Sequence, residues 1–201
     1  MTVSEPHAAV WAAARPYMRS RKNDVHIPLS YACAERLLEH HPEADSEVVL
    51  LAILLHDIGF AVVDQDEMWR DAFGPNMMES AVRIAHEREG ARLAREILTA
   101  LGHPPELVEE VAEIIAGHDT RPHALSRNDE LVKDADRGWR FGVTGVAVAC
   151  DWFRMTPSEY VERIAPQVEK FFTKAGARMA REDLAHTRAA LKTDVLAPVA
   201  A

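Results

Sequence analysis

Histidine and aspartate occur in this chain where the surrounding pattern calls for apolar side chains. His56 and Asp57 come directly after Val48–Leu55, which is the longest uninterrupted apolar run in the sequence. An ionised carboxylate at the end of such a run is costly to bury unless it is paired or binds a cation. Imidazole and carboxylate ligands together suit transition metals, so the pair is a candidate for metal binding. An aspartate near a helix end is usually solvated, however, and the pair alone does not predict a site.

Two further histidines and another aspartate lie on apolar faces of predicted helices. Within Ser80–Leu101, His86 shares a helical stripe with valine, leucine and isoleucine. In the helix predicted over Pro105–Gly117, the apolar stripe continues to His118 at the helix end. In the helix predicted after Asn128, Asp136 shares a face with the valine four residues before it. A single core-facing histidine is usually satisfied by a backbone carbonyl. Histidines and aspartates from several helices together indicate a metal site built between those helices.

The elements that must carry these side chains are helices almost throughout. No alternating β-branched run bounded by turn dipeptides is present, so the sequence predicts an all-α fold. The predicted helices are Pro28–His40 with Pro28 at its first position, Glu47–Asp57 with Ser46 as N-cap, Ser80–Leu101, Pro105–Gly117, a helix capped by Asn128, Val143–Phe153, a helix from the capping box at Thr156 and Glu159 towards Lys174, and Arg181–Leu191.

The segment Phe60–Glu79 departs from the helical pattern. It mixes acidic residues with Trp69, Arg70 and a glycine-proline-asparagine turn, which predicts a loop with a short helix. Long irregular segments in compact domains often form lids or binding loops. One interpretation is a lid that brings Trp69 or Arg70 near the substrate, and the other is a plain surface connection.

Length, composition and charge limit the function classes. The chain has 201 residues, 48% of them hydrophobic, which suits one globular domain. The net charge of −9 disfavours general nucleic-acid binding. The negative net charge does not exclude a small anionic substrate, because a bound metal ion can make the local potential positive. Two cysteines are expected to be buried and reduced, and no leader or membrane-spanning run is visible. We therefore expect a cytoplasmic protein that does not bind membranes; a homodimer is compatible with the sequence.

Three segments resemble one known signature. His26, the run Leu54–Gly59 and the run Lys133–Asp136 are similar to the H…HD…D pattern of the HD superfamily of metal-dependent phosphohydrolases. The resemblance implies a metal held by His26, His56, Asp57 and Asp136. Asp136 is preferred to Asp134 because the family's aspartate follows a small residue, which here is an alanine.

The resemblance covers about residues 24–141 and carries an expectation for the fold. It implies an all-α HD-domain helical bundle formed by this core, with additional C-terminal helices in residues 142–191 packed on it. Residues 1–201 would then form a single HD domain.

One branch of the superfamily adds two histidines between the HD pair and the last aspartate. These proteins bind two metals, and the HD aspartate bridges them. His86 and His118 stand at the corresponding places, and a glycine four residues after His86 is also similar to that branch. The expected cofactor is therefore one or two divalent transition-metal ions, which could be Mn, Fe, Ni, Co or Zn.

The resemblance implies a metal-dependent phosphohydrolase that acts on a small phosphorylated metabolite or nucleotide through a metal-activated water. Asp57 and His86 would then be catalytic as well as metal-binding. Lys133 and Arg137, with Arg140 beside them, are candidate partners of the phosphate. Phe60 stands where some nucleotidases of the family have an acid and cyclic-dinucleotide phosphodiesterases have a lysine, so neither narrower substrate class is predicted.

Two other functions are compatible with these ligands. Di-iron HD-type oxygenases, among them relatives of inositol oxygenase and of organophosphonate-cleaving enzymes, use the same six-ligand pattern. A degenerate HD domain that only binds a ligand is a further alternative, although the presence of all six ligands argues against it. Iron content and oxygen consumption would separate an oxygenase from a hydrolase.

Overall fold

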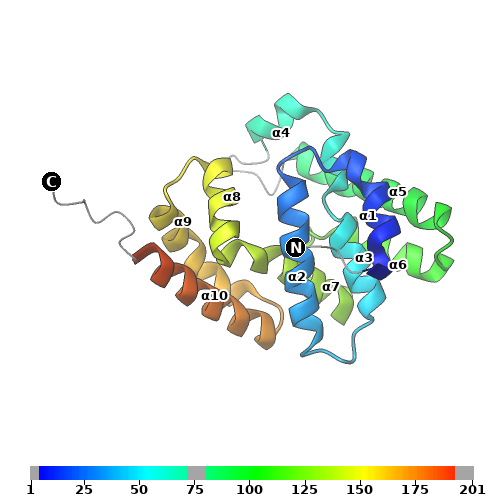
Figure 1. Ribbon diagram of the computed structural model, residues 1–201. Helices are drawn as coiled ribbons and strands as arrows, with labels where there is room; N and C mark the ends of the chain where they lie inside the picture. The colour runs from blue at the N-terminus through cyan, green and yellow to red at the C-terminus, as the bar shows by residue number, and fades with distance from the viewer. Residues whose placement is uncertain (1–4, 72–79, 193–201) are drawn as a thin grey trace.

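The computed structural model describes residues 5–71 and 80–192, and these residues form helices joined by short turns (Figure 1). No strand occurs within those two ranges, so the predicted all-α fold is confirmed. The α-helices are α1 (Ala8–Ala14), α2 (Asn23–Leu38), α3 (Ser46–Leu55), α4 (Gln65–Asp71), α5 (Ala81–Ala100), α6 (Pro105–Ile115), α7 (Arg127–Gly138), α8 (Val143–Phe153), α9 (Pro157–Ile164) and α10 (Lys174–Lys192). Short 3-10 helices are η1 (Glu5–His7), η2 (Arg15–Tyr17), η3 (Ile58–Ala61), η5 (Trp139–Phe141) and η6 (Ala165–Lys170).

Helix α3 lies at the centre of the larger hydrophobic core. It packs against α2, α6 and α7, and nearly all of its side chains from Val48 onward are buried. This explains its lack of a polar face, because a helix surrounded by other helices has no side turned to water. The N-cap is Asp45, whose carboxylate accepts from the backbone N–H groups of Glu47 and Val48, whereas the predicted cap, Ser46, is the first helical residue.

Helix α2 begins earlier than the sequence predicts. Its first residue is Asn23, so Pro28 lies inside the helix and not at its start. A proline there removes one hydrogen bond within the helix, and the surrounding packing tolerates this loss. The consequence for function is that His26 is a helical residue with a fixed direction. The chain enters the helix through Arg21 and Lys22, whose φ angles of 51° and 54° lie in the left-handed region.

The C-terminal helices form a second apolar cluster beside the first. In Figure 1, α8, α9 and α10 lie together on one side, and α2, α3, α5, α6 and α7 lie on the other. Helix α8 has the predicted bounds, and Thr156 and Glu159 form the predicted capping box of α9. The chain then turns into η6 at Pro166 before α10 begins at Lys174. Thr187 of α10 donates to the carbonyl of Phe141, which ties this group to η5, directly after α7.

The segment predicted as a lid contains η3 and α4, and its residues 72–79 lie outside the described part of the chain. Trp69 is 53% exposed on α4. Neither Trp69 nor Arg70 lines the main pocket described below, so the structure gives no support for placing them near the substrate. Within the described residues, no helix combines the length and the apolar character needed to cross a bilayer.

Two glycines let the segment after α3 cross α5 closely. A Cβ atom on Gly59 would lie 2.0 Å from the carbonyl oxygen of His86 and 2.5 Å from the backbone nitrogen of Gly90. A Cβ on Gly90 would in turn lie 3.2 Å from the carbonyl oxygen of His56. Backbone contact at this crossing therefore places His56 and Asp57 against the helix that carries His86.

Gly59→Ala should destabilise the fold, because the added methyl group can be accommodated only if two backbone segments separate. We expect a loss of about 2–3 kcal/mol or more in the free energy of unfolding, as in other overpacked cores. Gly142→Ala is the matched control, because the nearest atom to its Cβ would be 3.9 Å away. Denaturant titrations followed by circular dichroism, with chelator present, measure both variants. Equal stability of the two variants would refute this account of the crossing.

Candidate metal centre

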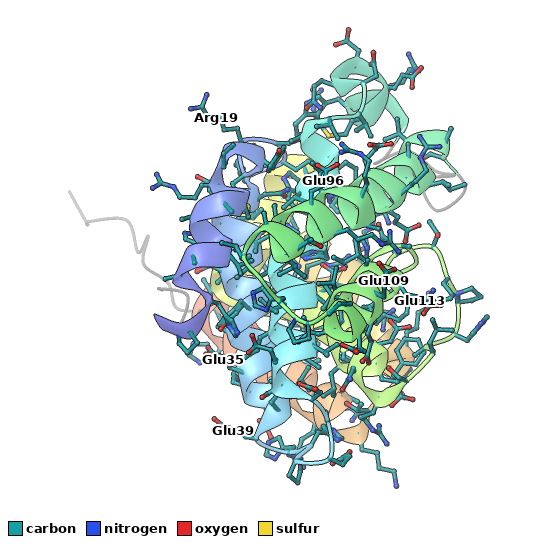
Figure 2. All side chains as sticks on the ribbon, turned by 90° about the vertical axis from the view of Figure 1, so that its right-hand side faces the viewer. Arg19, Glu35, Glu39, Glu96, Glu109 and Glu113 are labelled. Atoms are coloured by element: carbon teal, nitrogen blue, oxygen red, sulfur yellow. The ribbon has the colours of Figure 1, made fainter. Side chains whose placement is uncertain are left out.

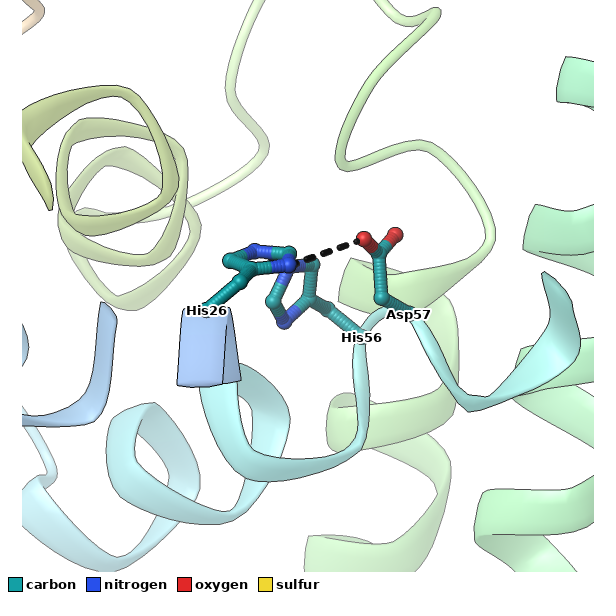
Figure 3. A group of neighbouring side chains, drawn as sticks. All are labelled: His26, His56 and Asp57. Atoms are coloured by element: carbon teal, nitrogen blue, oxygen red, sulfur yellow. Dashed lines mark hydrogen bonds and ion pairs between the residues drawn. The ribbon is translucent and has the colours of Figure 1, made fainter. Parts of the chain in front are cut away.

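The first group of ligand atoms comes from α2, the end of α3 and α7. The Nε2 atoms of His26 and His56 lie 3.2 Å apart, and Oδ1 of Asp136 lies 3.4 Å and 3.3 Å from them, respectively. Asp57 faces the same group through Oδ2, which is 3.7 Å from His56 Nε2 and 3.5 Å from His26 Nδ1. Figure 3 shows the two imidazole rings and the Asp57 carboxylate converging.

The second group lies on the opposite side of the same carboxylate. The Nε2 atoms of His86 and His118 are 3.5 Å apart, and each is 3.5 Å from Oδ1 of Asp57. Asp57 therefore presents one oxygen to each group, as a carboxylate bridging two metal ions would. The structure brings all six residues predicted as ligands together around this carboxylate.

The donor set fits metal ions. His56 and His118 donate from Nδ1 to the carbonyl oxygens of Ile53 and Ile115, at 2.7 Å and 2.8 Å. Each Nδ1–H is thereby fixed on a carbonyl and each Nε2 points into the group, which is the usual way a protein orients a histidine ligand. Ligands about 2.1 Å from a metal lie about 3.0–3.4 Å from one another, close to the separations within both groups. A cation between them would remove the repulsion among the converging lone pairs.

Burial and the nearby carboxylates shift the pKa values of two ligand histidines in opposite directions. Burial lowers the pKa of His26 to about 4, so this ring is neutral and can act as a ligand at pH 7. Burial alone would lower the pKa of His118 too, but Asp57 and Asp119 raise it to about 9. The carboxylates thus hold a proton on His118, which a metal ion would replace.

A buried arginine holds the central carboxylate. Arg21 donates from Nη1 to Oδ2 of Asp57 at 2.9 Å, and its guanidinium lies 4.0 Å over the Phe60 ring and 4.8 Å from that of Trp152. Burial would raise the pKa of Asp57, yet the Arg21 charge and the neighbouring histidines hold it well below its usual range. Arg21 therefore keeps Asp57 ionised and oriented.

Two other arginines neutralise carboxylates near the ligands. Arg140 donates to Oδ2 of Asp136 at 3.1 Å, and Arg83 pairs with Asp119 at 2.5 Å. Asp119 lies 4.0 Å from Nε2 of His86. Arg21 and Arg83 carry no local sequence signal, because arginine in a turn or on a helix usually contacts solvent. The one sequence signal for Asp119 is its position directly after the predicted ligand His118.

Lys133, predicted to contact phosphate, has a different set of contacts. Its ammonium group is buried and donates to the carbonyl oxygens of Gly117, His118 and Arg121. An ammonium has three N–H donors, and these three acceptors use them all. Although Lys133 borders the pocket, its contacts favour a role in holding the turn that carries His118 over direct contact with phosphate.

The same turn is held from its other side by Glu87, the residue after His86. Its Oε1 accepts from the backbone N–H groups of Asp119 and Thr120, both at 2.8 Å, and its Oε2 accepts from the Thr120 hydroxyl. A buried carboxylate thus satisfies the N–H groups of this turn, and a buried ammonium satisfies its carbonyls. Together they fix His118 relative to His86.

Arg137, the other predicted phosphate partner, does line the pocket. Its Nη1 donates to the carbonyl oxygen of Lys170 at 2.7 Å, which connects α7 to η6. Asp134 is turned away from the metal ligands and accepts from the backbone N–H groups of Phe172 and Thr173. This contact explains why Asp136, and not Asp134, joins the ligand group.

Four of the six ligands form the floor of a cavity of about 340 Å³ between the two groups of helices; they are His26, Asp57, His118 and Asp136. Its cationic lining residues are Arg21, Arg83, Lys133, Arg137, Arg140, Arg163 and Lys170, and its acidic ones are Asp57, Asp119 and Asp136. The wall is therefore cationic although the chain carries a net charge of −9. Acidic side chains gather elsewhere, as Figure 2 shows for Glu96, Glu109 and Glu113 on α5 and α6. Such a field attracts anions to the floor.

Removal of single ligands should reveal two separable ions. Wild-type protein, loaded with Mn²⁺ and dialysed, is expected to retain two ions per chain. His86→Ala and His26→Ala should each retain one, whereas Asp57→Asn should retain neither, because it belongs to both groups. Elemental analysis by mass spectrometry gives the counts, and His186→Ala, on an exposed position of α10, is the control. Retention of two ions by Asp57→Asn would contradict the bridging role.

Comparisons with known proteins identify the family and a similar fold. The family model described as the HD domain matches residues 26–137. Among solved structures, a predicted HD superfamily hydrolase from an uncultured Thermotogales bacterium has a similar fold. The two structures superpose with a TM-score of 0.59, and their sequences are 20% identical. The match covers 92% of this chain and 89% of that chain. No curated protein matches the chain. Because the family model covers more than half of the sequence, the chain belongs to the HD domain family.

Proposed function

We propose that the protein is a metal-dependent phosphohydrolase acting on a small phosphorylated metabolite or nucleotide. The observation that carries this proposal is the position of two His/Asp groups, sharing Asp57, on the floor of a cation-lined cavity. A phosphate monoester is an anion that would be attracted to this floor and would need neutralisation there. The family of the chain supports a hydrolase that uses metal ions.

The chain's own residues have separate tasks in this proposal. Two divalent ions held by the ligand groups would supply Lewis acidity and a water of lowered pKa. Arg21 keeps the bridging carboxylate ionised and in place, and Arg83 and Arg140 do the same for carboxylates beside it. Trp139 stacks on the His26 ring at 4.6 Å, which shields that ligand from water on one face.

The native metal belongs to the same proposal. The ligand set of imidazoles and carboxylates suits Mn, Fe, Ni, Co or Zn, and it is shared by di-iron oxygenases of the same fold. An oxygenase needs molecular oxygen to form product, and a hydrolase does not. A domain that only binds a ligand forms no product in either case. A single assay with two atmospheres therefore separates the three functions.

The test uses protein loaded separately with each of these metals. Phosphate release from p-nitrophenyl phosphate and from a panel of phosphorylated metabolites and nucleotides is measured under argon and under air. We expect equal release in both atmospheres, no oxygen uptake, and loss of nearly all activity in Asp57→Asn, whose helical circular dichroism should persist. Product formation that requires oxygen would assign the oxygenase function, and no product with any metal would leave the ligand-binding function.

A further inference from the structure

The C-terminal helices build the outer wall of the cavity. Five residues of α9 and η6 line it, and all lie outside the segment matched by the family model. They are Tyr160, Arg163, Ile164, Gln167 and Lys170. This wall is therefore an addition to the ligand-bearing core.

Charge on α9 and η6 is sorted between two faces. Arg163 and Lys170 each follow a glutamate in sequence, Glu162 and Glu169. Both glutamates turn towards α10, where Glu162 pairs with Arg188 and Glu169 with Arg181, each at 2.9 Å. The two glutamates thus form ion pairs with α10, and the two cations that follow them in sequence border the cavity.

The outer cations differ from the inner ones in their partners. Arg21, Arg83 and Arg140 each pair with an aspartate that also lines the cavity. No ion pair joins Arg163 or Lys170 to a carboxylate among the described residues. Arg163 contacts the Met155 sulfur at 3.5 Å and lies 4.5 Å from the centre of the Phe153 ring, two contacts that hold the side chain without neutralising it.

Apolar and aromatic side chains line the cavity together with the cations. Trp139 and Trp152 lie beside the metal ligands, and Tyr160 and Ile164 lie on the outer wall; all four are buried or nearly so while lining the cavity. The cavity lining thus combines the metal ligands, a set of large apolar and aromatic side chains, and two cations, Arg163 and Lys170, that have no carboxylate partner among the described residues.

We propose that this cavity selects substrates with two anionic groups, the second being an oxyanion bound by Arg163 and Lys170. The class is a phosphate monoester that bears a further phosphoryl or carboxylate group across a largely nonpolar spacer. The proposal rests on the proposed function for the identity of the first group. The second group is recognised by charge and hydrogen bonding alone, so binding tests it without turnover.

The experiment measures binding to the Mn²⁺-loaded protein by calorimetry. The probes are α,ω-alkane bisphosphonates of increasing spacer length, the matching phosphonates with a terminal carboxylate, and alkyl monophosphonates of the same lengths. Over a narrow range of spacers, we expect both kinds of bis-anion to bind about tenfold tighter than the monophosphonates. Metal content is measured after each titration, so that removal of metal by the probe is detected.

Paired variants locate the second site. Arg163→Gln with Lys170→Gln should abolish the preference for bis-anions while monophosphonate affinity and metal content change little. Arg181→Gln with Arg188→Gln removes the same charge from the α10 side of these helices and should keep the preference.

Absence of a bis-anion preference in the wild type, or its loss in both double variants, would overturn the proposal. A preference for only the phosphonate arm would restrict the second group to phosphoryl. Hydrolysis without a bis-anion preference refutes the second site alone, and a preference without any hydrolysis refutes the proposed function alone.

Discussion

The structure depends on one buried carboxylate. Asp57 receives a hydrogen bond from Arg21 and faces two histidines through each side of its carboxylate. A buried charge of this kind is tolerable only when its surroundings supply positive charge and fixed donors. Arg21 supplies part of that charge, and the convergence of bare imidazole nitrogens leaves room for metal ions to supply the rest. The packing around Asp57 holds the histidine and aspartate side chains at the distances that metal ligands keep from one another.

Several independent devices contribute to that geometry. The glycine crossing brings the segment after α3 into backbone contact with α5, which sets His56 and Asp57 against His86. The turn after α6 is fixed by Glu87 and Lys133, which sets His118. Each device uses close packing or a fully satisfied buried polar group, and such contacts allow little movement. The ligands come from five helical segments, yet their separations stay within a few tenths of an ångström of what a metal site needs.

Much of this arrangement could be predicted from the sequence, and the limits have physical causes. His86, His118 and Asp136 were found by their helical phase, because a polar residue on an apolar stripe must point inward. His26 required the resemblance to a family, since Pro28 favoured a helix starting after it. Lys133 was placed correctly on its helix, but its acceptors lie on a distant turn that no local pattern reveals. Arg21 could not be found, because its role depends on a left-handed turn and on the tertiary position of Asp57.

The C-terminal helices illustrate the same limit at a larger scale. Their bounds and capping box followed from local signals, whereas their contribution to the cavity follows only from packing against α7 and η5. The segment that matches the HD domain family model thus holds the six candidate ligands, and the helices after residue 142 line the cavity beside them.

Anomalous diffraction from crystals of the Mn²⁺-loaded protein tests the central claim most directly. The account predicts two peaks on opposite sides of the Asp57 carboxylate, one beside His26, His56 and Asp136 and the other beside His86 and His118. A single peak, or a second peak that does not contact Asp57, would contradict it.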